Sequence, residues 1–356
     1  KRCYDMMKKW VEYQSSPDRR NYGVRTVDGK EVPEQSDLAT IPYIQVQQCR
    51  GDHLTYDNST PYIYSATAYA AHSADILRRT AYILGKTDDE KRYSELFENI
   101  KRAFNDAWVN DDGSVSYYGE VSSQTAHCGE SVALDGSVTR YTYYAENTPH
   151  CPSQTAYALA VDFDLIPKDK LKNTREYFKN SILRNNGKLT VGFLGISHLA
   201  PALSKVGLDD VAFKLLEQED NPSWLYSVKN GATTIWERWN SYIAETGTFG
   251  DVSMNSFNHY SYGAIGQWFF TDILGIRPVE FGYKAFMLAP KFGGGLTYAK
   301  GSFTSPYGKI SSAWKLHDGK FTYDCTVPTN TTATLKLPNG DIHTLADGSY
   351  HFEINV

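Results

Sequence analysis

The sequence predicts a mainly α-helical domain followed by a small antiparallel β-sandwich, and two observations lead to this fold class. Up to about residue 275, apolar residues recur every three or four positions in segments joined by short turns, as in paired helices. Past Pro278 the pattern alternates with a period of two, and turn signals separate the alternating segments. We therefore expect a helical domain at 1–277 and a β domain at 278–356.

The chain opens inside an amphipathic segment. Residues 1–16 already have a helical pattern, with one face formed by Cys3, Met6, Trp10 and Tyr13. Natural proteins seldom begin in this way, so we expect the chain to be the C-terminal part of a longer protein. Without the preceding helices, apolar faces would be exposed, and the protein could associate through them.

The next two helices have clear boundary signals. Thr60-Pro61 begins the first, because proline fits the first helical position, and Gly85 ends it. Thr87 followed by Glu90 forms a capping box that begins the second. The expected core faces are Tyr69, Ser73, Ile76, Thr80 and Ile83 in the first helix, and Leu96, Phe97, Ile100, Phe104 and Trp108 in the second.

Helical periodicity returns after a polar, tyrosine-rich stretch at 113–150 that gives no clear prediction. The later helices are expected at 153–163, 168–183, 195–206, 209–219 and about 260–274. Such pairs fit a bundle, a solenoid or a closed α/α barrel. No repeat of about 20–50 residues is visible, which disfavours the solenoid.

The β domain is predicted from alternation and turns. Strands are expected at 309–316, 320–327 and 332–337. Asp318-Gly319 and Asn339-Gly340 separate them, and both dipeptides favour tight hairpin turns. Gly293-Gly294-Gly295 lacks the Lys-Ser/Thr of a phosphate loop, so we interpret it as a turn.

Composition excludes several function classes. The 36 basic and 41 acidic residues give a net charge of −5 without a dense basic run, which argues against nucleic acid as a partner. No apolar run reaches the ~18 residues that a membrane span needs. The five cysteines lack the spacing of a metal site, so we expect neither a metal nor a cofactor, and one disulfide stays open. The patterns leave the compartment open, with a periplasmic or secreted location favoured over a cytoplasmic one.

One segment carries the candidate chemistry. Residues 231–240 read Gly-Ala-Thr-Thr-Ile-Trp-Glu-Arg-Trp-Asn, in which Glu237 stands between Trp236 and Trp239. A carboxylate beside aromatic rings is what a glycosidase needs to activate water next to a sugar. The alternative is an ordinary surface ion pair between Glu237 and Arg238 near packed tryptophans.

The segment at 233–240 resembles the signature of bacterial α-L-rhamnosidases, glycoside hydrolase family 78. Further segments resemble the same family in the same order: 60–73, 153–159, 221–226, 256–263, 293–296 and 326–337. They cover most of the chain from about residue 50 onward. The resemblance implies an (α/α)6 barrel, incomplete at its N-terminus with about eight helices, followed by the β-sandwich.

The resemblance also implies an inverting hydrolysis that releases terminal α-L-rhamnose from a glycan or glycoside. Inversion needs a general acid and a general base about 6.5–9.5 Å apart, with a water between them. Glu237 matches the family's base. The family's acid lies in an Asp- and Arg-rich motif without a counterpart between Lys1 and Cys49, so we expect it upstream of this chain.

Five further residues are candidates for substrate binding. His259 matches a histidine that contacts the sugar in the family, with a buried structural role as the alternative. Asp52-His53 stands where many members have Gly-Asp-Trp-Leu, so His53 replaces a stacking tryptophan and could equally be an ordinary loop residue. The alternating helices of a barrel would bring Trp108 near the site, although a core tryptophan is the alternative. Trp236 flanks the base.

Two other functions stay open. One is an (α/α)6 glycosidase of different sugar specificity, because barrel loops vary while the frame persists. The other is a non-catalytic carbohydrate-binding relative, which His53 and the missing acid both permit.

Overall fold

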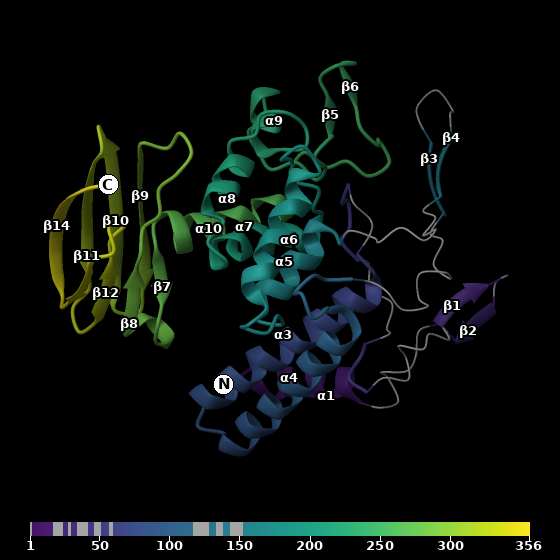
Figure 1. The fold of residues 1–356 in the computed structure, drawn as a ribbon, viewed down its shortest axis with the longest axis horizontal. Coiled ribbons are helices and arrows are strands. Elements are labelled where there is room, and N and C mark those ends of the chain that lie inside the picture. Colours follow the sequence, from purple (N-terminus) through teal and green to yellow (C-terminus); the bar gives the residue numbers. More distant parts are fainter. Residues whose placement is uncertain are drawn as a thin grey trace.

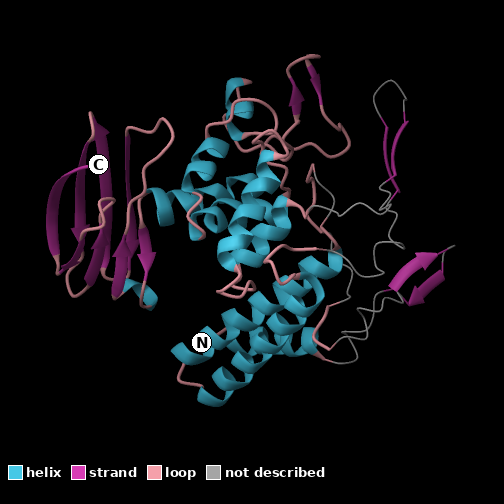
Figure 2. Ribbon diagram, viewed as in Figure 1, coloured by secondary structure: helices cyan, strands magenta, loops and turns pink. Residues whose placement is uncertain are grey.

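The computed structural model describes residues 2–16, 24–27, 30–33, 42–45, 51–56, 60–116, 128–132, 138–142 and 152–356. Helices gather in the centre of the molecule, and two larger sheets lie together on one side, beyond α10 (Figure 1). Figure 2 shows the same division by secondary structure, with long loops at the end of the helices that carries α9. The predicted fold class, a helical domain followed by a sheet-rich region, is confirmed.

The helical domain is built from antiparallel neighbours. Its helices are α1 Tyr4–Ser15, α3 Tyr62–Ile83, α4 Thr87–Trp108, α5 Gln154–Asp162, α6 Leu171–Leu183, α7 Phe193–Lys205, α8 Asp209–Leu216 and α9 Trp224–Lys229. Hydroxyl groups of Thr60 and Ser153 share a hydrogen bond and so join the starts of α3 and α5. Ser153 also accepts from the Ala156 amide at 3.0 Å and caps α5. These two helices therefore begin at the same end of the domain.

The last helical segment changes its pitch. The sequence predicts one helix at about 260–274, whereas the chain forms a 3-10 turn Ser261–Ala264, α10 Ile265–Trp268 and a π-helix Phe269–Ile273. The π-turn buries Asp272 at 1% exposure beside Ile273. The apolar run is thus helical, but its pitch changes along its length, and Asp272 is buried in the π-helical part.

The core face of α3 differs from the expected one. Ile76 and Ile83 are 37% and 45% exposed, and the fully buried face contains alanines and one leucine: Ala71, Ala74, Leu77 and Ala81. Small side chains let α3 approach its neighbours closely, so the packing of the domain selects the alanine face over the larger isoleucines.

Helix α4 buries the expected face but begins differently. Phe97, Ile100, Phe104 and Trp108 are buried as predicted. The capping box is wrong, because Thr87 is already helical and no side chain caps the helix. Instead, Asp89 in the first turn, where a negative charge is favourable, accepts hydrogen bonds of 2.7 Å from Tyr4 and Lys8 of α1.

Helix α1 places its predicted apolar face in solvent. Met6, Trp10 and Tyr13 are 66%, 54% and 44% exposed, while Tyr4 and Val11 pack against α3 and α4. Helix α1 has two faces with apolar residues, and the face with the Tyr4–Asp89 hydrogen bond is the one that packs inward. Association through the exposed stripe of Met6, Trp10 and Tyr13 stays a prediction.

A group of titratable side chains joins α3, α5 and α7 away from the loops. The His198 ring binds Asp162 through Nδ1 at 2.6 Å and Tyr69 through Nε2 at 3.2 Å. His72 stacks on Phe163, with ring centroids 4.0 Å apart and planes 9° apart. Burial and the neighbouring His198 lower the pKa of His72, although the carboxylates of Asp162 and Asp75 oppose this effect. His72 is therefore neutral at pH 7.

This lowered pKa predicts an acid-sensitive contribution to stability. Below pH ~6.5 the unfolded chain protonates His72 while the folded chain does not, so the free energy of unfolding falls as pH falls, by at most about 1.4 kcal/mol per pH unit. His72→Phe keeps a ring on Phe163 and should remove this slope in urea unfolding between pH 5 and 7 (a range set by the ordinary histidine pKa of about 6.5). His317→Asn, at a side chain that is 88% exposed, is the control. Equal slopes in His72→Phe and the unsubstituted chain would contradict the prediction.

The β domain consists of two four-stranded sheets. One has the order β14-β11-β10-β9 and the other β13-β12-β8-β7. Their strands are β7 Ile276–Pro278, β8 Ala285–Leu288, β9 Tyr298–Ser305, β10 Gly308–His317, β11 Lys320–Val327, β12 Thr332–Lys336, β13 Ile342–Leu345 and β14 Gly348–Asn355. Within the described residues, three short hairpins precede these strands in the chain: β1 Val24–Val27 with β2 Lys30–Pro33, β3 Cys128–Val132 with β4 Val138–Thr142, and β5 Tyr242–Ile243 with β6 Thr248–Phe249.

Turn chemistry sets the register of the sandwich. Asp318 and Gly319 have φ of 48° and 74° and join β10 to β11, as the hairpin prediction required. One expectation is corrected, since the sandwich is not wholly antiparallel. Strands β8 and β12 pair in parallel, because the chain passes through β9, β10 and β11 of the other sheet before it returns.

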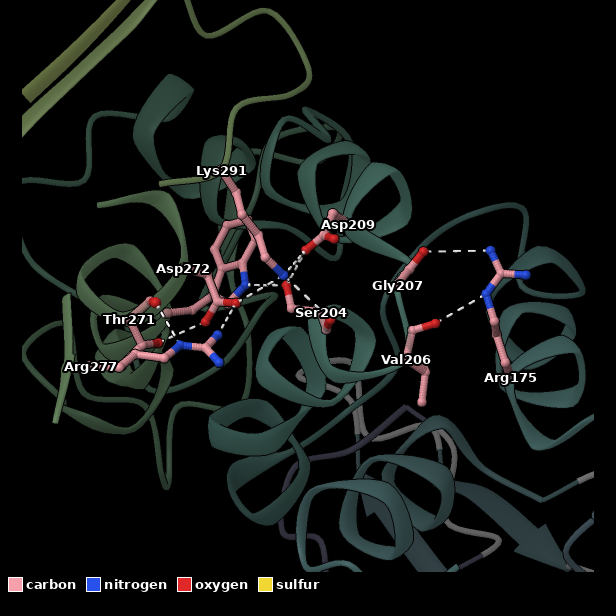
Figure 3. A network of polar contacts seen from close by, with 10 residues as sticks. Arg175, Ser204, Val206, Gly207, Asp209, Thr271, Asp272, Arg277 and Lys291 are labelled. Carbon is pink, nitrogen blue, oxygen red and sulfur yellow. Dashed lines mark hydrogen bonds and ion pairs between the residues drawn. The ribbon is translucent and has the colours of Figure 1, made fainter. Parts of the chain in front are cut away.

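A polar network ties the β domain to the helices (Figure 3). Asp272 is 1% exposed and binds both Arg277 and Lys291, and the Lys291 ammonium also lies 2.7 Å from Asp209 at the start of α8. A buried carboxylate is tolerated when cations compensate it, so these contacts hold strand β7 and the loop after β8 against the helical domain.

The turn at 293–295 packs against α8 and the residue that follows it. Gly295 donates its amide to Glu217 Oε1 at 2.6 Å, and a Cβ on Gly293 would lie 2.4 Å from the Phe213 ring. Gly294 has a φ of +58°. The interpretation of these residues as a turn is confirmed, and their close approach to α8 explains why three glycines occur together.

Within the described ranges, no helix is both long and apolar enough to cross a membrane. The same ranges contain no group of three His, Cys, Asp or Glu side chains suited to a metal ion. Cys3 and Cys325 are free thiols, and Cys49 and Cys151 lie outside the described residues. Most of the polar stretch at 113–150 also lies outside them.

Candidate active site

Two distant segments pair to hold Glu237. The Glu237 amide donates to the Ser256 carbonyl at 2.8 Å, and the Ser256 amide donates to Glu237 Oε2 at 2.7 Å. Two residues away, the His259 amide donates to the Ile235 carbonyl at 2.8 Å. These bonds fix the backbone and one carboxylate oxygen of Glu237, and they bring His259 beside the same extended segment.

The neighbouring arginine has a different partner. Arg238 Nη2 lies 3.4 Å from Asp251 Oδ2, and the Arg238 amide donates to Ser241 Oγ at 3.1 Å. The Glu237 carboxylate faces Ser256 instead. The contacts therefore disfavour the alternative in which Glu237 is half of a surface ion pair with Arg238.

The tryptophans on either side of Glu237 pack against other aromatic rings. Trp236 is 6% exposed and meets the Phe257 ring edge-on at 5.2 Å. Trp239 stacks on Tyr262 at 3.8 Å, and its Nε1 donates to the Val191 carbonyl at 3.0 Å. Burial raises the pKa of Tyr262 far above its usual range, so its hydroxyl stays protonated. These contacts thus hold the residues on either side of Glu237 and Arg238 in place.

Two cavities lie next to the segment that contains these rings. The tryptophan cavity has a volume of about 260 Å³ and is lined by Trp224, Ser227, Val228, Ala232, Thr233, Thr234, Ile235, Trp236, Trp239 and Tyr262. The outer cavity has a volume of about 390 Å³ and is lined by Thr234, Ile235, Asn258, His259 and Tyr260. Thr234 and Ile235 form the ridge between the two. Of the predicted residues, Trp236 lines one cavity and His259 the other, while Glu237 lines neither and follows Trp236 in the chain.

Phe193 connects the two histidines that the sequence singled out. It stacks on His259 at 4.8 Å and meets the His53 ring edge-on at 5.4 Å. The Ser261 amide donates to His259 Nδ1 at 3.3 Å, which leaves the proton of a neutral ring on Nε2. The structure thus brings His53 and His259 together at the start of α7.

Asp52 is buried beneath this group and is satisfied by the protein. It accepts from the amides of Gly192, Leu194 and Gly195 at 2.8–3.0 Å and from the Thr155 hydroxyl. Burial raises the pKa of Asp52 above its ordinary value, and the hydrogen bonds oppose that rise. The carboxylate therefore clamps the start of α7 to the loop that carries His53.

The chain matches two models of known protein families. The family model described as the bacterial α-L-rhamnosidase six-hairpin glycosidase domain matches residues 1–273. The chain belongs to this family. A second model, described as the bacterial α-L-rhamnosidase C-terminal domain, matches residues 275–351 of this rhamnosidase-family chain.

Similar proteins support the assignment. An α-L-rhamnosidase of Formosa agariphila is 33% identical over 98% of this chain, which covers 32% of that protein. One from Streptomyces avermitilis is 37% identical over 81% of the chain, which covers 24% of it. A crystal structure of Streptomyces avermitilis α-L-rhamnosidase complexed with L-rhamnose superposes with a TM-score of 0.77 at 31% identity, over 99% of this chain and 30% of that one. The chain thus spans about a third or less of the length of these relatives.

One residue of the rhamnosidase-family chain that was expected at the site, Trp108, lies in the core instead. Trp108 is 3% exposed and packs edge-on against Tyr64 and Phe104, with centroids 5.2 and 5.1 Å away. A buried ring has no face to offer a sugar. This placement corrects the expectation that Trp108 lies at the site and favours the core alternative.

Sequence reasoning missed two supports of the site. Phe193 lies two residues before the helix expected at 195–206 and was given no role, because an apolar residue near a helix start looks like core. Asn221 donates its amide to the Trp239 carbonyl at 2.6 Å and accepts from the Tyr56 hydroxyl at 3.1 Å. The only signal for Asn221 was its place in the family-like segment at 221–226.

Proposed function

We propose that the protein is an inverting glycoside hydrolase that releases terminal α-L-rhamnose from a glycan or glycoside, with Glu237 as the general base. The observation that carries this proposal is the carboxylate of Glu237, which is held by Ser256 and stands two residues after the ridge between two cavities in a rhamnosidase-family chain. A relative whose structure is described as complexed with L-rhamnose supports rhamnose as the sugar.

In this mechanism Glu237 takes a proton from the water that attacks the anomeric carbon. The Ser256 amide holds one carboxylate oxygen at 2.7 Å and so sets the direction of the side chain. Inversion also needs a general acid on the opposite face of the ring. The sequence resemblance assigns that acid to a motif upstream of this chain.

The histidines are proposed to contact the sugar. His259 presents Nε2–H as a donor when its Nδ1 accepts from Ser261, which suits a sugar hydroxyl. His53 stands next to Phe193 in place of a stacking tryptophan and would bind by a hydrogen bond rather than by a broad apolar face. We propose Asp52 as a positioning residue for both histidines. Trp236 is proposed to contact the substrate from the wall of the tryptophan cavity.

The proposal is tested by product analysis on the full-length polypeptide. Nitrophenyl α-L-rhamnoside should be hydrolysed in preference to nitrophenyl β-D-glucoside and α-L-arabinofuranoside. Proton NMR in the first minutes should show β-L-rhamnose, because inversion of an α-glycoside forms the opposite anomer. The α-anomer as first product would overturn inversion, and preference for another sugar would overturn the rhamnosidase assignment.

A further inference from the structure

Three aromatic rings form a near-parallel column at the edge of the site. Phe193 and His259 stack at 4.8 Å with planes 20° apart, and His259 and Tyr260 stack at 5.3 Å with planes 12° apart. The inner end of the column lies against Tyr262, whose ring meets Phe193 edge-on at 5.5 Å. The column therefore has one anchored end and one free end.

The free end is Tyr260. Its side chain is 85% exposed, the highest value among the large apolar side chains within the described residues. Burial of Tyr260 thus contributes little to folding, since its ring leaves most of its surface in water. The ring nevertheless stacks on His259, so a ligand that stacks on Tyr260 would extend an existing column of rings.

The chemistry of the outer cavity suits a sugar. Besides the two rings it is lined by Ile235, the exposed Asn258 and Thr234, whose hydroxyl donates to the Phe257 carbonyl and keeps its lone pairs as acceptors. An aromatic face packs against the C–H face of a sugar, and amide and hydroxyl groups pair with the sugar hydroxyls. An aryl group would leave those polar groups unpaired, which costs affinity.

We propose that Tyr260 is the stacking platform of a second saccharide subsite, which holds the sugar ring that is joined to the rhamnose. This inference rests on the proposed function and deepens it. The preferred substrates are then rhamnosyl oligosaccharides rather than aryl rhamnosides. His259 belongs to both subsites, because its ring stacks on Tyr260 while its Nε2–H is proposed to bind the rhamnose.

The test is calorimetric binding of three ligands to the full-length polypeptide: L-rhamnose, a sulfur-linked α-L-rhamnosyl-glucose and phenyl 1-thio-α-L-rhamnoside. The thio-linkages resist hydrolysis, so affinity is measured without turnover. We expect the disaccharide to bind about tenfold more tightly than L-rhamnose, a typical gain from one stacked ring. Tyr260→Ala should remove most of this gain and leave the affinity for L-rhamnose unchanged, whereas Tyr260→Phe should retain it.

Tyr82→Ala is the matched control, because Tyr82 is 66% exposed on α3 and touches neither cavity. Retention of the disaccharide gain in Tyr260→Ala would overturn the subsite, and so would an equal gain for the phenyl thioglycoside in the unsubstituted protein. Binding of L-rhamnose without any gain from the second ring would overturn this inference alone. Failure to bind L-rhamnose at all would instead overturn the proposed function.

Discussion

Replacing Glu237 with glutamine should lower kcat on a rhamnoside by at least about 100-fold, the lower end of the loss expected for a general base. Glutamine keeps the size of the side chain, and its carbonyl oxygen can still accept from the Ser256 amide. It cannot take a proton from water. Because inversion has no covalent intermediate, no other group replaces the base, and KM should change much less than kcat.

Glu245→Gln is the matched control, because this exposed carboxylate lies in the turn of the nearby β5–β6 hairpin. Its kcat should stay close to that of the unsubstituted enzyme. Added azide should restore part of the activity of Glu237→Gln by attacking in place of the activated water, with inverted configuration in the product. Near-normal kcat in Glu237→Gln would remove Glu237 from the mechanism.

Asp52→Ala should lower the free energy of unfolding by about 3 kcal/mol or more. The substitution removes the acceptor of three amides, those of the buried Gly192 and Gly195 and of the partly buried Leu194. Each unsatisfied buried donor costs about 1–3 kcal/mol. Urea unfolding measures the loss, and hydrogen exchange should accelerate at these three amides first, because the start of α7 is freed locally.

Asp111→Ala provides the control for Asp52, since the Asp111 side chain is fully exposed and pairs with Lys170 only at 3.5 Å. Its effect should stay below about 1 kcal/mol, as for other surface ion pairs. The experiment also separates two roles of Asp52. Unchanged stability together with lost L-rhamnose affinity would show a direct sugar contact and contradict a positioning role.

Local sequence signals determined the elements of this fold. The repeat of apolar residues every three or four positions predicted the helices at 60–84 and 87–108, and period-two alternation predicted the strands after Pro278. Asp318-Gly319 predicted its hairpin, because only a few residue types adopt the positive φ that the turn requires. Each of these signals depends on residues within one element or one turn.

Packing decided which faces of those elements are buried. In α3 the sequence favoured Ile76 and Ile83, yet the alanine face lies inside, because the neighbours demand close approach. At the start of α4 the contact with Lys8 and Tyr4 replaced the predicted capping box. Hydrophobicity alone cannot rank two faces of one helix when the partner's shape is unknown.

The sequence by itself determined the candidate base and its family, because Glu237 and His259 stand in long motifs whose residue order carries the resemblance. Only the tertiary structure decided what surrounds them. It placed Trp108 in the core, turned Asp52 into the clamp of α7, and made Phe193 the link between His53 and His259. The physical reason is that these contacts join residues that lie far apart in the chain, and the partner of a buried polar or aromatic side chain is selected by three-dimensional packing rather than by its neighbours in sequence.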